Sequence, residues 1–205
     1  MASGPLQTSV RQMLATRTRK VHENLHVHPW IASLAKPGLT ISRYGVVLGA
    51  YHDFYHHLEQ SCSNHPLPEC LSLRPARERL SLDLNSLAAV RLATSRPCVE
   101  LTIDDPVELL GALYVLHGAS FGARILNRNV RIELPDAPRH FLESSTAGDA
   151  WQPLIAELEA FANNELAREK LTHGAKATFV AFGTFVTRFC ESELDQQVQK
   201  QSGMQ

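Results

Sequence analysis

The sequence predicts an all-α protein, a bundle of helices, and three observations lead to that prediction. Apolar residues recur at helical spacing in several long segments, strong helix start and stop signals separate these segments, and no segment alternates apolar and polar residues as strands do. No period of about 20 to 50 residues repeats, which excludes solenoids and propellers. Of the 205 residues, 44% are hydrophobic and 20% charged, enough for one sizeable core. We expect a single domain over residues 1–205, with an ordered core from about residue 8 to residue 194.

The first two predicted helices flank a segment that contains prolines. The first begins at Pro5 or Thr8 and continues to Leu25, with apolar residues at helical spacing. The second opens after Ser42, carries aromatic and aliphatic residues along one broad face, and ends before Pro66. Both helices have one apolar face and therefore pack against a common core.

Four more helices are predicted in the rest of the chain, after Pro66. One of them has a strong start at Asp105-Pro106, because aspartate caps a helix N-terminus well and proline favours the first turn. We expect the Gln-rich residues 195–205 to fray. The predicted helices span residues 76–90, 106–129, 151–171 and 175–194.

Composition excludes several classes of protein. Lys plus Arg is 20 and Asp plus Glu is 21, so no overall basic charge indicates nucleic acid or an anionic membrane as partner. The longest apolar runs are far shorter than the roughly 18 residues of a spanning helix, and the N-terminus lacks a secretory pattern, so we expect a cytoplasmic protein. The four cysteines form no close CxxC pair, which argues against a zinc knuckle or a disulfide framework.

Histidines are the first candidates for a functional role. His22 lies beside the apolar stripe of the first helix, where a histidine is more often a satisfied boundary residue than a ligand. His52 and His56 have the i, i+4 spacing that lets two imidazoles bind one metal ion, and Glu59 follows them. The glutamate of an HExxH motif is missing, so a polar helix face is the favoured interpretation and a metal site the alternative.

Gly118 and Gly122 share one face of an otherwise apolar helix, where each costs about 1 kcal/mol relative to alanine. Two explanations remain open at this point. The glycines permit close helix–helix packing or a kink, or they let a flat ligand approach bare backbone. Both explanations predict a bent helix.

The order of several segments resembles the heme oxygenase family of the bacterial type. The resemblance rests on Leu14–His22, on Leu39–Tyr44 with the Tyr/Phe/His-rich helix after it, and on Leu113–Arg124; Ala175–Phe179 is a weaker echo. It implies a single-domain helical bundle with a glycine-kinked distal helix, and heme held between that helix and the first one. It also implies cleavage of heme by O₂ to biliverdin, CO and ferrous iron, with electrons from an external ferredoxin or reductase.

The resemblance assigns roles to particular residues. His22 falls at the axial ligand of the heme iron, and heme is both cofactor and substrate. Gly118, Ser120 and Gly122 fall on the distal helix, at the catalytic face. Tyr114 and Arg19 are the implied partners of the heme propionates. Other cations that the sequence offers for the propionates are Arg17, Lys20, Arg124 and Arg128.

Three positions depart from the family pattern. Ala119 replaces the aspartate of mammalian members, His117 replaces the bacterial glutamate before the first distal glycine, and His26 stands where the family has an acidic or amide partner of the axial ligand. A His117 ring on the iron would close both axial sites. The alternative function is therefore a non-enzymatic heme-binding or heme-sensing protein on the same fold.

Overall fold

The computed structural model describes residues 9–63, 65, 68–87, 97–144 and 147–202, and all regular secondary structure in these ranges is helical. The predicted all-α class is therefore confirmed for the described ranges, which contain no strand. The elements are α1 (Val10–His26), α2 (Pro29–Ser33), α3 (Ile41–Cys62), the 3₁₀ turn η1 (Glu69–Leu71), α4 (Arg74–Ser86), α5 (Pro106–Glu133), α6 (His140–Glu143), α7 (Ala147–Phe161) and α8 (Glu165–Ser202).

Two helix starts show how local sequence sets these boundaries. The Ser9 hydroxyl accepts a hydrogen bond from the Gln12 amide and caps α1. The Asp105 carboxylate accepts from the Val107 amide at 2.8 Å and from the Glu108 amide at 3.2 Å, with proline in the first turn of α5. The start of α5 predicted from Asp105-Pro106 is confirmed, although the helix ends at Glu133 rather than near residue 129.

The last two helices differ from their prediction. The break between α7 and α8 lies at residues 162–164, and the predicted break near Gly174 lies inside α8. α8 continues as far as Ser202, and the fraying expected for residues 195–205 stays a prediction. The short helices α2 and α6 were not predicted. The predicted end of the 76–90 helix falls partly outside the described residues, and α4 ends at Ser86.

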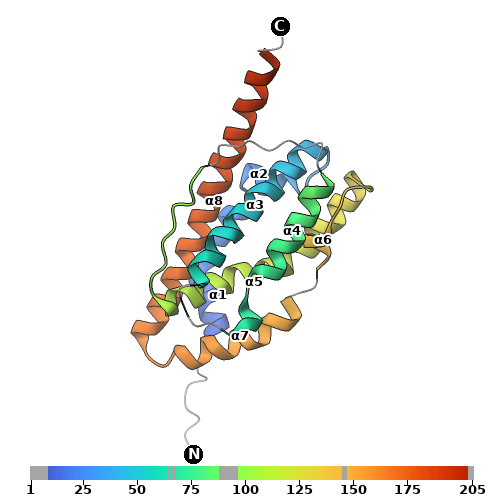
Figure 1. Cartoon of the computed structure of the whole chain (residues 1–205). Helices are drawn as coiled ribbons and strands as arrows, with labels where there is room; N and C mark the ends of the chain where they lie inside the picture. Colours follow the sequence, from blue (N-terminus) through green and yellow to red (C-terminus); the bar gives the residue numbers. More distant parts are fainter. Residues whose placement is uncertain (1–8, 64, 66–67, 88–96, 145–146, 203–205) are drawn as a thin grey trace, which may run out of the picture.

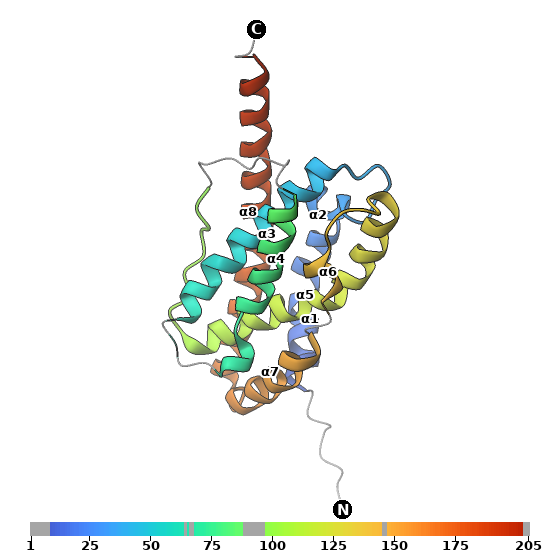
Figure 2. The same ribbon diagram turned by 45° about the vertical axis from the view of Figure 1, so that its right-hand side comes forward.

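α5 lies at the centre of the bundle and packs against α6, α7 and α8, while α3 packs against α4 and α8 (Figure 1). α1 lies along α8 and reaches α7, which closes one end of the molecule. The C-terminal part of α8 extends beyond the other helices (Figure 2). This arrangement leaves α1 and the second half of α5 on two sides of a common space, with α3 and α8 behind it.

Two glycines lie at the crossing of α5 and α8. A Cβ atom on Gly111 would overlap the carbonyl oxygen of Leu171 and lie 2.9 Å from the amide nitrogen of Ala175. A Cβ atom on Gly174 would likewise overlap the Glu108 carbonyl. The two helices approach backbone to backbone here because neither glycine carries a side chain.

A buried carboxylate fixes the short helix α6. Asp83 on α4 has no exposed surface, and it accepts hydrogen bonds from the amides of His140 at 2.8 Å and Phe141 at 3.0 Å. The His140 ring nitrogen Nδ1 lies 2.7 Å from the same carboxylate. Phe141 then packs against the rings of Tyr51 and Tyr55 on α3. The α4 carboxylate thus holds α6 against the side of α3 that faces the core.

Candidate functional site

A cavity of about 510 Å³ lies between α1 and α5, within the size range of ligand pockets. Its walls are mostly apolar and aromatic, and α3, α7 and α8 complete them. In the part of the chain that the structure describes, no aspartate or glutamate lines it. The lining residues on which the argument depends are Arg11, Thr18, Arg19, His22, His26, Tyr51, Tyr55, Tyr114, Gly118, Phe121, Gly122, Trp151, Phe179 and Phe182.

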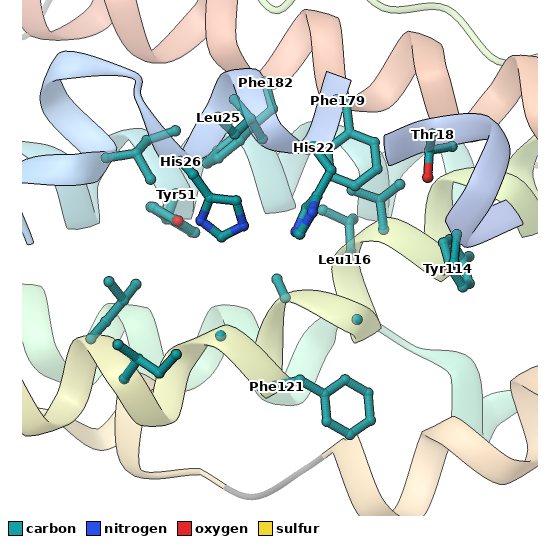
Figure 3. Close-up of a pocket in the computed structure, with 18 of the residues that line it drawn as sticks. Thr18, His22, Leu25, His26, Tyr51, Tyr114, Leu116, Phe121, Phe179 and Phe182 are labelled. Carbon is teal, nitrogen blue, oxygen red and sulfur yellow. The ribbon is translucent and has the colours of Figure 1, made fainter. Parts of the chain in front are cut away.

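His22 points from α1 across this cavity toward α5 (Figure 3). Its ring packs edge-on against Phe179 of α8, with centroids 5.5 Å apart, and against His26 one turn later in α1, at 4.5 Å. Burial and the neighbouring His26 lower the pKa of His22 below its usual 6.5, and Glu23 opposes this shift. At neutral pH the ring is therefore uncharged, which is the form that binds a metal.

Bare helix backbone forms the opposite wall. A Cβ atom on Gly122 would meet nothing within 4 Å, and one on Gly118 would only touch the Trp151 ring at 3.7 Å. Close helix–helix packing is therefore not the reason for this glycine pair. The ribbon of α5 bends between Leu116 and Phe121, as the glycines predicted (Figure 3). The glycines leave the cavity open where side chains would otherwise fill it.

Two arginines and a tyrosine supply polar groups at the Thr18 end of the cavity. Arg19 lines the cavity, and so does Tyr114, whose ring packs on Trp151 at 5.7 Å; their role toward propionates stays a prediction. Arg11 lines it too, although it was not singled out from the sequence. The signal was present, because 11 residues are close to three helical turns and place Arg11 on the His22 face of α1.

Two other distal residues lie elsewhere. The Ser120 hydroxyl donates to the carbonyl of His117 at 2.6 Å, and Ser120 is absent from the cavity lining. The His117 ring is turned away, with Nε2 3.1 Å from the Leu71 carbonyl, and burial lowers its pKa. His117, which the sequence raised as a second axial ligand of the iron, therefore does not face His22.

The alternative metal site on the second long helix is wrong. The His52 ring lies 3.0 Å from the Asp53 carboxylate and 3.1 Å from the Ser81 hydroxyl, and Glu59 pairs with Arg77. His56 is exposed. Across the described ranges, no group of three or more His, Cys, Asp or Glu side chains is placed to hold a metal ion. These residues form a polar side of α3, which is the interpretation that the sequence analysis favoured over a metal site.

Comparison with known proteins supports the fold. No protein-family model and no curated protein matches the sequence. Among solved structures, the chain is similar to a heme oxygenase from Leptospira interrogans, with a TM-score of 0.68 and 17% sequence identity. The alignment covers 87% of this chain and 98% of the other. At this identity the similarity shows the fold, so the heme-oxygenase-like helical bundle predicted from the sequence is confirmed.

Proposed function

We propose that this protein is a heme oxygenase, which binds heme in the cavity between α1 and α5 and cleaves it to biliverdin, CO and ferrous iron. One observation carries the proposal. On a heme-oxygenase-like fold, a neutral imidazole on one wall of an apolar cavity faces bare glycine backbone on the other. A flat, mostly apolar macrocycle with a metal at its centre fits these two walls.

The residues of the cavity fit heme in three respects. His22 offers a neutral ring nitrogen as axial ligand, and its ring orientation is restricted by Phe179 and His26. Aromatic and aliphatic side chains accept the faces and apolar edge of the macrocycle. Arg11 and Arg19 bring positive charge to one end, where carboxylates such as the two propionates are held.

The chemistry follows from what each wall provides. When bound, heme supplies the iron that activates O₂ and the ring that is opened. Gly118 and Gly122 keep side chains out of the space facing His22, so a small molecule fits there and its position is restricted by backbone. With no lining carboxylate among the described residues, ordered water is the route for protons. Electrons come from an external ferredoxin or reductase.

The same lack of a carboxylate favours one second candidate, a protein that binds or senses heme without cleaving it. Both functions use His22 and the same cavity. They differ in whether the heme disappears when electrons and O₂ are supplied.

The first experiment is a titration of the purified protein with hemin, followed by an absorption spectrum under air with ascorbate or a ferredoxin–reductase system. A Soret band that forms and then decays into a biliverdin band supports the enzyme. A stable Soret band supports the binding protein, and the absence of a Soret band overturns both. A His52→Ala variant is the matched control, because His52 does not line the cavity and its ring lies against Ser81 of α4.

We further propose that the chain works as one cytoplasmic domain without nucleic-acid or membrane partners. α5 is long and apolar enough to cross a membrane, a property that core helices of soluble proteins share. In this fold α5 packs against α6, α7 and α8. Fractionation of cells that express the full chain tests this part of the proposal.

A further inference from the structure

α3 carries three buried tyrosines whose hydroxyl groups differ in one respect. The Tyr44 hydroxyl donates to the Pro138 carbonyl at 2.9 Å, and the Tyr55 hydroxyl donates to the Leu116 carbonyl at 3.1 Å. Tyr51 is only 9% exposed, and its hydroxyl makes no hydrogen bond within the described part of the chain. This hydroxyl is not among the fully buried polar atoms that lack a partner in the described residues, so it is open to the cavity that Tyr51 lines.

The Tyr51 side chain lines the cavity, so its hydroxyl can donate a hydrogen bond to a molecule bound there. Its ring is fixed by edge-on contact with Phe182 at 4.8 Å and by Phe141 at 5.6 Å. A ring held from two sides keeps its hydroxyl in one place. Burial raises the pKa of Tyr51 to about 12, so the group remains a donor throughout the physiological range.

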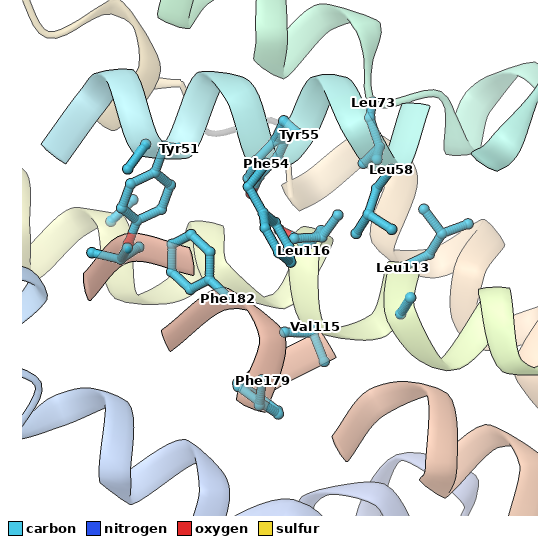
Figure 4. Packing of buried hydrophobic residues seen from close by; sticks show 14 of the residues in the cluster. Tyr51, Phe54, Tyr55, Leu58, Leu73, Leu113, Val115, Leu116, Phe179 and Phe182 are labelled. Carbon is cyan, nitrogen blue, oxygen red and sulfur yellow. The ribbon is translucent and has the colours of Figure 1, made fainter. Parts of the chain in front are cut away.

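The position of Tyr51 along α3 places it beside the glycine wall. Figure 4 shows Leu58, Tyr55 and Tyr51 in this order along α3, and α5 passes beneath them from Leu113 to Leu116. The Tyr55 hydroxyl reaches the Leu116 carbonyl. Tyr51, one turn earlier in α3, therefore lies over the part of α5 that follows Leu116, which contains Gly118 and Gly122.

Charge indicates which kind of group the hydroxyl meets. Figure 3 shows Tyr51 at the His26 end of the cavity and Thr18 with Tyr114 at the other end. The two lining arginines, at positions 11 and 19, start from the Thr18 end of α1, so carboxylates are drawn there. The ring contacts of Tyr51 are all aromatic. A small hydrogen-bond acceptor, rather than a carboxylate group, is the partner that such surroundings suit.

We propose that the Tyr51 hydroxyl donates a hydrogen bond to the small ligand that occupies the cavity beside Gly118 and Gly122, opposite His22. This inference rests on the proposed binding of heme. The glycine side of the cavity then has one side-chain hydrogen-bond donor in addition to its bare backbone. Through this donor, the protein binds a small ligand that accepts a hydrogen bond more tightly than one of the same size that does not.

The test compares Tyr51→Phe with Tyr44→Phe, which removes a hydroxyl that lies outside the cavity lining. Each protein is loaded with hemin, and fluoride is titrated as a hydrogen-bond-accepting ligand of the ferric iron. Loss of one hydrogen bond weakens fluoride binding about three- to tenfold in Tyr51→Phe and leaves it unchanged in Tyr44→Phe. In the heme-free proteins, the urea midpoint falls in Tyr44→Phe only, since only Tyr44 loses a bond within the chain.

Three results would overturn the proposal, and each is distinguishable. If the unaltered protein binds no hemin, the proposed function fails and this inference with it. If hemin binds with His22 ligation and fluoride affinity is equal in Tyr51→Phe, the inference alone fails. If Tyr51→Phe weakens hemin itself and leaves fluoride affinity unchanged, Tyr51 holds a propionate and the assignment is wrong.

Discussion

An alanine at Gly111 is expected to destabilise the protein, whereas an alanine at Gly122 in the same helix is not. At Gly111 the added Cβ would lie 2.9 Å from the amide nitrogen of Ala175 and overlap the Leu171 carbonyl. An ordinary contact needs at least 3.4 Å, so α5 and α8 must separate by more than about 0.5 Å. The obstructing atoms are backbone, which cannot rotate aside as a side chain does.

The magnitude follows from two opposing effects. Alanine is favoured over glycine inside a helix by about 1 kcal/mol, and this gain applies at both positions. Overpacking costs about 1–3 kcal/mol, and backbone overlap belongs at the upper end of that range. Gly111→Ala is thus expected to lower the free energy of unfolding by about 2 kcal/mol, and Gly122→Ala to raise it by up to about 1 kcal/mol.

Urea unfolding of the heme-free proteins, followed by far-ultraviolet circular dichroism, measures the difference. Hemin affinity provides a second measurement with the opposite order, because a methyl group at Gly122 projects into the cavity and one at Gly111 does not. Gly122→Ala is therefore the stable variant that binds hemin more weakly. Equal unfolding free energies for the two variants would refute the close crossing of α5 and α8.

Three further changes have defined outcomes. His22→Ala is expected to lower hemin affinity by at least about tenfold and to abolish turnover until imidazole is added; an unchanged visible spectrum would exclude His22 as the ligand. Burial lowers the pKa of His117, so the unfolded chain takes up a proton at higher pH than the folded one, and stability present above about pH 6.5 is lost as the pH falls. The urea midpoint should therefore drop between about pH 7.5 and pH 5.5, and His117→Gln should reduce that drop; an undiminished drop would show that His117 is not its source. Asp83→Ala leaves the amides of His140 and Phe141 without an acceptor and should cost about 2–4 kcal/mol of unfolding free energy, whereas a loss below about 0.5 kcal/mol would contradict its capping role.

Capping residues and prolines in the sequence predicted the helix starts well. They could not predict the contacts between helices. The start of α5 at Asp105-Pro106 depends on a capping bond between residues two and three apart, which the sequence displays directly. Gly174 was interpreted as a break between helices, since glycine weakens a helix. The structure gives it another role, because the Glu108 carbonyl occupies the space of its missing side chain. Only the partner helix reveals that role.

The candidate site was predictable where helical periodicity sets the facing side. His22 and Gly122 line the cavity because each lies on the face of its helix that borders the cavity. The same helical spacing from His22 places Arg11 on that face of α1. The orientation of His117 depends on a carbonyl of η1, 46 positions away in the chain, so neither spacing nor composition indicates it. For Tyr51 the informative feature is the lack of a partner, which is visible only once the neighbouring tyrosines have theirs.

The backbone contact at Gly111 divides α5 into two parts with different freedom of motion. The part around Gly111 is held against α8, and its amides should exchange with solvent deuterium among the slowest in the protein. The segment from Gly118 to Ile125 borders the cavity; its Phe121 is exposed and packs only edge-on against the Trp151 ring at 4.9 Å, and its Ile125 is exposed. Exchange should therefore rise from Gly111 to Ile125 and fall again near Val130, which is fully buried. A flat ligand that enters between α1 and α5 then needs only this middle segment to shift, while α5 stays held near Gly111 and near Asn129, whose side chain donates to the Leu34 carbonyl.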